Sequence, residues 1–263
     1  MRSGRTLERL AGPPRGASGA RAQRSPARWR TRRAGPNPWD DGAEVPDQEW
    51  LRGPRAALAR EGLQQSLLFP VMRFVTSPTV YGADDLLHAP QPAVIAPNHS
   101  SDIDTPLVLW ALPRSWRART VVGAASDRFY ARRRSALMAA LWINTFPFDR
   151  SGELHGLAAA SAHLRAGRNV LLYPQATRTS GLEGWRGGVG RLCTATGAPV
   201  VPVHVSGTAG VMPKGRGVTR RGRAEIRFGR AVEPILDEDP REFTQRVGAA
   251  ITALADPRGR RRA

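Results

Sequence analysis

Short apolar runs alternate with segments of helical periodicity from Thr79 onward, and this alternation limits the possible folds more than any other feature of the sequence. Strands that alternate with helices at this spacing are typical of an α/β domain with a mainly parallel sheet. We therefore predict an α/β fold: a single domain whose largely parallel central sheet is flanked by helices. The segments expected to contain strands are 79–87, 92–100, 120–126, 145–150, 169–181, 198–207 and 224–234. The segments expected to form helices are 104–112, 136–144, 154–167, 189–197 and 240–255.

The composition divides the 263-residue chain into four parts. Residues 1–48 are rich in Arg, Gly, Pro and Ser and cannot bury enough apolar surface to order, so we expect a disordered basic tail. Residues 49–78 contain an amphipathic helical pattern, which Pro70 is expected to kink. That helix can pack on the core or contact a membrane surface. Its apolar residues, spaced by three and four, are Leu63, Leu67, Leu68, Val71, Met72 and Val75. Residues 79–256 form the predicted domain, and 257–263 a basic C-terminal tail.

The net charge of +18 is compatible with binding either to nucleic acid or to anionic lipid. Lys214 is the only lysine, so almost all of the positive charge is arginine, and much of it is near the two ends of the chain. The central region lacks stacking aromatics within a basic patch, so no specific nucleic acid is predicted. We expect a cytoplasmic protein in peripheral contact with an anionic membrane, on the inner face of the cell membrane. No apolar run of 18 residues is present, so no transmembrane helix is predicted.

The segment APNHSSDIDTPL (96–107) contains the clearest candidate for acid–base chemistry. His99 follows a predicted strand, and Asp104 lies about one turn into the next helix. A carboxylate bound to one imidazole nitrogen leaves the other free as a general base. Asp102 is an alternative partner, although we expect it to cap the turn instead. Taken alone, this pair also fits a polar loop without chemistry.

No metal site and no cysteine chemistry are predicted. The single cysteine, Cys193, rules out an internal disulfide and a cysteine-based zinc site. His155, His163 and His204 show no spacing that would supply further ligands to a metal at His99.

Two arginines and several hydroxyls follow other predicted strands. Arg178 lies among Thr177, Thr179 and Ser180, and Arg150 comes directly after the run FPFD. Guanidinium groups beside small hydroxyls suit a phosphate group. Either arginine alone is weak evidence for a phosphate site, because the chain contains so many arginines.

Four motifs in order resemble those of the 1-acylglycerol-3-phosphate (lysophosphatidic acid) acyltransferase family. NHSSDID (98–104) matches Asn-His followed by four residues and Asp, and FPFDR (146–150) resembles the second motif. YPQATRTS (173–180) lies where the family has Phe-Pro-Glu-Gly-Thr-Arg-Ser, and APVVPVHVSGT (198–208) resembles the fourth motif. The resemblance covers about residues 79–235.

This resemblance implies transfer of an acyl chain from acyl-CoA or acyl-carrier protein to a hydroxyl of a lysophosphatidate-like acceptor, in phospholipid biosynthesis. It implies that His99 is the general base and Asp104 its orienting partner, with no acyl-enzyme and no cofactor or metal. Arg150 and Arg178 would hold the acceptor's phosphate. Weaker candidates for substrate binding are Asn98, Gln175, Thr177 and Ser180.

The third motif departs from the family at two positions. Gln175 replaces the family's glutamate and keeps an acceptor oxygen without the charge, and Ala176 replaces glycine. Two alternatives therefore stay open: an acyltransferase for another lysolipid or a glycolipid, or a non-catalytic lipid-binding relative.

Overall fold

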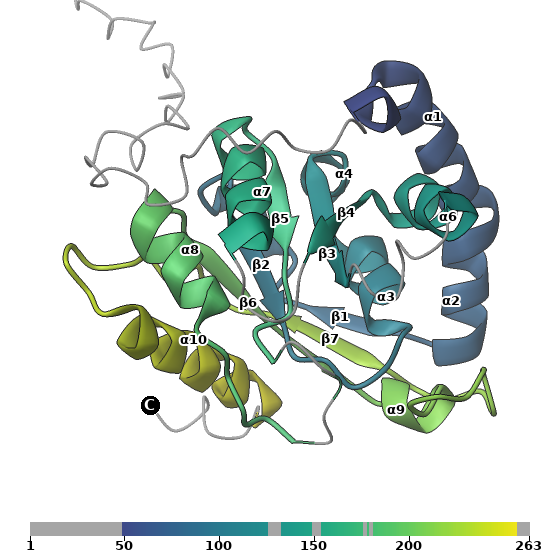
Figure 1. Cartoon of the computed structure of the whole chain (residues 1–263). Helices are drawn as coiled ribbons and strands as arrows, with labels where there is room; N and C mark the ends of the chain where they lie inside the picture. The colour runs from purple at the N-terminus through teal and green to yellow at the C-terminus, as the bar shows by residue number, and fades with distance from the viewer. Residues whose placement is uncertain (1–48, 126–132, 149–153, 176–177, 179–180, 257–263) are drawn as a thin grey trace, which may run out of the picture.

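A mixed sheet of seven strands forms the centre of the protein (Figure 1). The computed structural model describes residues 49–125, 133–148, 154–175, 178 and 181–256; the predicted terminal tails lie outside them. The strands are β1 (Thr79–Tyr81), β2 (Val94–Pro97), β3 (Thr120–Ala125), β4 (Thr145–Phe148), β5 (Asn169–Leu171), β6 (Val200–Ser206) and β7 (Glu225–Phe228). Their order across the sheet is β1-β7-β6-β2-β5-β3-β4.

Most neighbouring strands are parallel, which confirms the predicted fold class, and only β6 and β7 pair antiparallel. The reason lies in the connection between those two strands. It contains the single-turn helix α9 (Thr208–Val211) and no crossover helix. A parallel pair needs a crossover of a dozen or more residues, usually helical, whereas antiparallel strands can be joined by a direct return.

Helices cover both faces of the sheet (Figure 1). One apolar core joins α2 and α3 to alternate strand residues such as Ile95, and the other joins α7, α8 and α10 to the intervening residues Val94 and Ala96. Burial on both faces explains why the strands read as continuous apolar runs. The longer helices are α1 (Pro54–Leu63), α2 (Phe69–Thr76), α3 (Asp104–Ala111), α6 (Arg133–Ile143), α7 (Leu154–Arg165), α8 (Gly188–Thr196) and α10 (Pro240–Ala255). Shorter turns are Glu49–Arg52, Asp84–His88 and α4 (Arg114–Arg117).

The helix predicted around Pro70 differs in form from the expectation. It begins at Pro54, and a π-helical stretch, Gln64–Leu68, separates α1 from α2. Pro70 has no N–H for the carbonyl of Ser66, and its ring crowds that carbonyl, so the irregularity precedes the proline. The N–H of Phe69 bonds to the oxygen of Gln64, five residues back, which widens this turn.

The apolar residues of this helix divide between two faces. Met72 and Val75 are buried in the core, whereas Leu67 and Val71 are exposed, as is Phe74. The helix therefore has two apolar faces, one packed and one open to solvent. Within the described residues, no helix has the length and apolar character needed to cross a membrane.

Candidate active site

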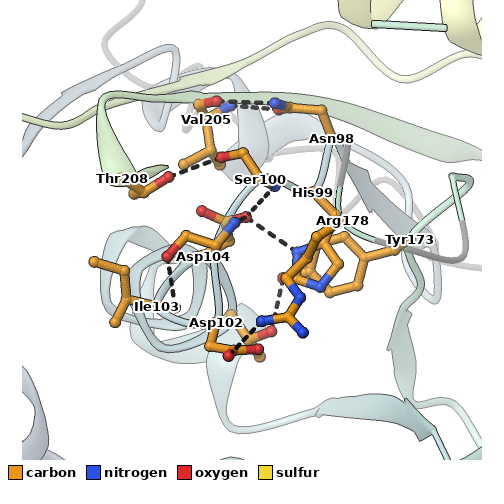
Figure 2. A network of polar contacts seen from close by, with 12 residues as sticks. Asn98, His99, Ser100, Asp102, Ile103, Asp104, Tyr173, Arg178, Val205 and Thr208 are labelled. Carbon is orange, nitrogen blue, oxygen red and sulfur yellow. Dashed lines mark hydrogen bonds and ion pairs between the residues drawn. The ribbon is translucent and has the colours of Figure 1, made fainter. Parts of the chain in front are cut away.

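The site lies beyond the carboxyl ends of β2, β5 and β6, the sheet edge where α/β folds hold their ligands. The loop after β2 is fixed to β6 by Asn98. Its side-chain amide donates to the oxygen of Val205 at 2.9 Å and accepts from the nitrogen of Val205 at 2.7 Å (Figure 2). Both polar atoms of the Asn98 side chain thus hold the loop, and its predicted contact with substrate stays a prediction.

His99 and Asp104, the predicted pair, meet in this loop. His99 Nδ1 lies 3.0 Å from Asp104 Oδ2 (Figure 2). The His99 side chain is 16% exposed, whereas that of Asp104 is fully buried. The imidazole lines a large cavity, so it is accessible to a substrate while its partner is not.

Asp104 is held by more than the histidine. Its Oδ2 accepts from the backbone nitrogens of Ser100 at 2.7 Å and Ser101 at 2.8 Å. These donors stabilise a negative charge that burial would otherwise penalise. Because an ionised carboxylate only accepts, His99 Nδ1 must carry the proton of this contact, and the neutral ring keeps a lone pair on Nε2. This is the tautomer that a general base requires.

An aromatic ring that the sequence did not single out lies against His99. Tyr173 stacks on His99, with ring centroids 3.9 Å apart and an interplanar angle of 26°. Its hydroxyl lies 2.6 Å from that of Thr105. Burial, with the nearby charge of Asp104, raises the pKa of Tyr173 well above its usual value, so the phenol stays neutral. The only sequence signal was its position at the start of the third motif.

Gln175 uses its side-chain amide to connect two loops. Its Oε1 accepts from the backbone nitrogen of His99 at 2.9 Å. Its Nε2 donates to the carbonyls of Gly181 at 2.8 Å and Glu183 at 3.0 Å. A carboxylate could replace the first contact but not the other two, because it has no hydrogen to donate. The glutamine is therefore suited to this loop, and it is almost fully buried.

Arg178 extends over the site and pairs with Asp102, Nη1 to Oδ2 at 2.6 Å (Figure 2). The structure differs from the expectation that Asp102 caps the turn, because the turn's N–H groups at Ser100 and Ser101 bond to Asp104 instead. Asp104 is also the first residue of α3, and Ile103 is its N-cap. Arg150, the other predicted phosphate-binding residue, lies outside the described residues, as do Thr177 and Ser180, the weaker candidates for substrate binding.

A cavity of about 1810 Å³ opens beside His99 and has two contrasting walls. The first, called here the apolar wall, comprises Leu68, Val122, Met138, Ala139, Trp142 and Ile143, from the end of the π-helical stretch, β3 and α6. The second, called here the basic wall, comprises Arg186, Arg191 and Arg241, from the segment before α8, from α8 itself and from the start of α10. His99, Asp102 and Arg178 also line the cavity.

Two other kinds of chemistry find no support among the residues that the structure describes. No group of three or more His, Cys, Asp and Glu side chains lies close enough to hold a metal ion. Cys193 is buried in α8, and its burial raises the pKa of the thiol, which disfavours the nucleophilic thiolate.

Comparisons with known proteins point to acyl transfer. Residues 77–206, which include His99, Asp104, Gln175 and Arg178, match the family model named Acyltransferase. Among solved structures, the chain is similar to the 1-acyl-sn-glycerophosphate (LPA) acyltransferase PlsC of Thermotoga maritima. The TM-score is 0.56 at 20% identity, over 74% of this chain and 81% of that chain, which shows a common fold. A search of curated proteins found no match.

Proposed function

The chain belongs to the acyltransferase family, and from this premise we propose that it transfers an acyl group from a thioester donor to a lysophosphatidate-like glycerol phosphate. The observation that carries the proposal is the His99–Asp104 pair at the edge of a cavity with one apolar wall and one basic wall. Acyl-CoA and acyl-carrier protein are both donors of the required kind. The apolar wall is suited to the acyl chain, because burying methylene groups is favourable at about 0.8 kcal/mol each.

The proposed mechanism needs no covalent enzyme intermediate. Nε2 of His99 takes the proton of the acceptor hydroxyl as the hydroxyl oxygen attacks the thioester carbonyl carbon. The carbon–sulfur bond then breaks, and the thiolate leaves with the proton that His99 accepted. Asp104 holds the ring in the required tautomer and stabilises the imidazolium that forms between the two proton transfers.

Arg178 is the proposed ligand of the acceptor's phosphate. It lines the cavity beside His99, and one of its nitrogens is engaged by Asp102. Because guanidinium presents five N–H donors, this contact leaves others for a phosphate. Arg150, Thr177 and Ser180 are proposed to assist.

The first experiment is acyl transfer by purified protein from acyl-CoA and, separately, from acyl-carrier protein to lysophosphatidate. We expect turnover in the wild type and a loss of about 10³-fold in His99→Ala, since a general base contributes ~10²–10⁴-fold. Circular dichroism and thermal unfolding would check that His99→Ala is folded. Near-normal turnover in His99→Ala would remove His99 from the mechanism.

We also propose peripheral contact with an anionic membrane on the cytoplasmic side, through α2. Val71 and Phe74 are exposed on α2, and Leu67, exposed in the π-helical stretch before it, continues the same face at helical spacing. Arg221 lies 3.9 Å from the centroid of the Phe74 ring. Apolar side chains beside arginine suit an interface with anionic lipid. The double variant Val71→Ser/Phe74→Ser should float less with anionic vesicles than the wild type. Equal flotation would rule out this face, and Leu236→Ser, an exposed apolar residue remote from α2 in sequence, is the control.

A further inference from the structure

The basic wall of the cavity is not used by the chemistry proposed above. Its three arginines line the same cavity as His99, but they come from a separate part of the chain. Arg186 precedes α8, Arg191 is in its first turn, and Arg241 is in the first turn of α10. The function of this wall is therefore a separate question.

Backbone contacts fix the positions at which the three arginines leave the main chain. A Cβ atom at Gly190 would overlap the carbonyl oxygen of Pro240. The helices α8 and α10 are therefore in contact at the residues that directly precede Arg191 and Arg241. The backbone nitrogen of Arg186 donates to the oxygen of Pro174 at 2.7 Å, next to Gln175. Figure 1 shows α8 and α10 side by side on one face of the sheet.

The positive charge of this wall is available for a ligand. All three arginines are exposed, and within the described part of the chain their side chains make no ion pair with a carboxylate. Among the described residues, two acids line the cavity, and both are engaged elsewhere. Asp102 pairs with Arg178, and Asp239 accepts from the backbone nitrogens at the start of α10. By contrast Arg246, further along α10 and outside the cavity wall, pairs with Glu238.

We propose that Arg186, Arg191 and Arg241 bind the phosphate of the phosphopantetheine arm that carries the acyl group. This inference rests on the proposed acyl transfer. Both possible donors, acyl-CoA and acyl-carrier protein, carry the acyl chain on a phosphopantetheine thiol, so they share one phosphate on the side of the thioester away from the chain. With the thioester carbonyl at His99 and the acyl chain along the apolar wall, the arm extends toward the basic wall.

The cavity has two separate sources of positive charge, Arg178 and the basic wall, and the reaction has two phosphate-bearing substrates, which supports this assignment. Arg178 lies beside His99, where the attacking hydroxyl and its nearby phosphate must be. The basic wall is a second place for an anion on the same cavity, and a two-substrate transfer brings a second phosphate. Guanidinium groups are well matched to phosphate oxygens through paired, charge-assisted hydrogen bonds.

The test is steady-state kinetics with Arg186→Ala, Arg191→Ala and the double variant Arg191→Ala/Arg241→Ala. We expect the KM for the donor to rise about fivefold in each single variant and ~20-fold in the double variant, with kcat and the KM for lysophosphatidate little changed. Arg230→Ala, an exposed arginine outside the cavity wall, is the matched control and should leave all three constants unchanged. With an acyl-pantetheine thioester, which has no phosphate, all variants should match the wild type.

The donors identify the source of the phosphate. A rise with each donor that the wild type turns over supports recognition of the shared arm, whereas a rise with one alone, where both are turned over, would overturn it in favour of groups found only on that carrier. An unchanged KM for both donors, or a rise in the KM for lysophosphatidate instead, would overturn the inference and leave the proposed function intact.

Calorimetric binding of free CoA and of phosphopantetheinylated carrier protein, without acceptor, separates the two proposals. A wild type that binds a carrier but shows no turnover would contradict the proposed function, and loss of that binding in the double variant would still support the site. A wild type that binds neither carrier, or a double variant that binds as well as the wild type, would overturn the site.

Discussion

The loops that follow β2 and β5 build the two halves of the candidate site by different means. The β2 loop holds His99 through contacts within seven residues of sequence, from Asn98 to Asp104, and anchors itself to β6. The β5 loop reaches the first loop through two long-range contacts, Gln175 to the backbone of His99 and Arg178 to Asp102, each 76 residues apart. The first loop orients His99, the proposed base, and the second positions the cation of Arg178 beside it. Local chemistry and long-range placement can therefore be tested separately.

The largest effect in this comparison is expected from Asp104→Asn. Asparagine keeps an oxygen for the two backbone donors but removes the charge that stabilises the His99 imidazolium. We expect kcat to fall about 10²-fold, within the ~10²–10⁴ range of acid–base effects. The same substitution two residues earlier, Asp102→Asn, is the control and should alter the KM for the acceptor rather than kcat. Equal losses of kcat in both variants would show that the two aspartates do not have separate roles.

A smaller effect is expected from Arg178→Ala, which removes the cation of the second loop. The KM for lysophosphatidate should rise about tenfold, because a charge-assisted hydrogen bond to phosphate is lost. Steady-state assays with lysophosphatidate and with a phosphate-free monoacylglycerol provide the check. The KM for the phosphate-free acceptor should be unchanged. A similar rise for both acceptors would assign Arg178 to holding Asp102 rather than to binding phosphate.

The His99–Asp104 pair was predictable from the sequence because the two residues are only five positions apart. A histidine after a strand and an aspartate five residues later are close in almost any strand–helix connection, and the structure has them 3.0 Å apart. The fold class was predictable for a related reason: alternation of strands and helices, and continuous apolar strands, reflect a sheet buried on both faces.

The β5 loop was not predictable, because its contacts depend on the order of strands. That β5 lies next to β2 cannot be read from strand patterns, so the pairing of Arg178 with Asp102 was missed, and so was the stacking of Tyr173 on His99. The antiparallel direction of β7 was missed because hydrophobic periodicity does not report strand direction. The π-helical stretch before Pro70 was missed because periodicity does not report a local widening of a helix. The family resemblance identified Gln175 as a residue of the third motif but did not predict the two hydrogen bonds that its side-chain nitrogen donates.

Gln175→Glu would test this last point, with an effect on stability. The introduced carboxylate would face the carbonyls of Gly181 and Glu183 without a hydrogen to donate. Leaving buried polar groups unsatisfied costs about 1–3 kcal/mol. We expect the free energy of unfolding to fall by that amount in urea titrations, and turnover to fall rather than rise. Gln65→Glu, an exposed glutamine on the π-helical stretch, is the control. Higher turnover in Gln175→Glu would mean that the charge of the family's glutamate is what the reaction needs.

The smallest effect concerns His204 on β6, and it decides how an acid-side loss of activity is interpreted. Burial, with the charge of Arg227, lowers the pKa of His204 in the folded protein below its ordinary value near 6.5. The unfolded chain therefore binds more protons between the two pKa values, and the free energy of unfolding decreases as the pH falls through that window. Below the folded-state pKa, His204 adds no further loss. His204→Gln should flatten this part of the pH dependence, measured by urea unfolding at pH 7.5 and pH 5.

If the stability of His204→Gln has the same pH dependence as the wild type, His204 does not contribute to acid sensitivity. If the dependence is flatter, kcat/KM below pH 6.5 must be measured in His204→Gln as well. Only an acid-side loss that persists in that variant, with the protein folded, belongs to the reaction rather than to the stability of the sheet. The His204→Gln variant would thereby separate the pH dependence of the reaction from the stability of the sheet that carries the β2 loop.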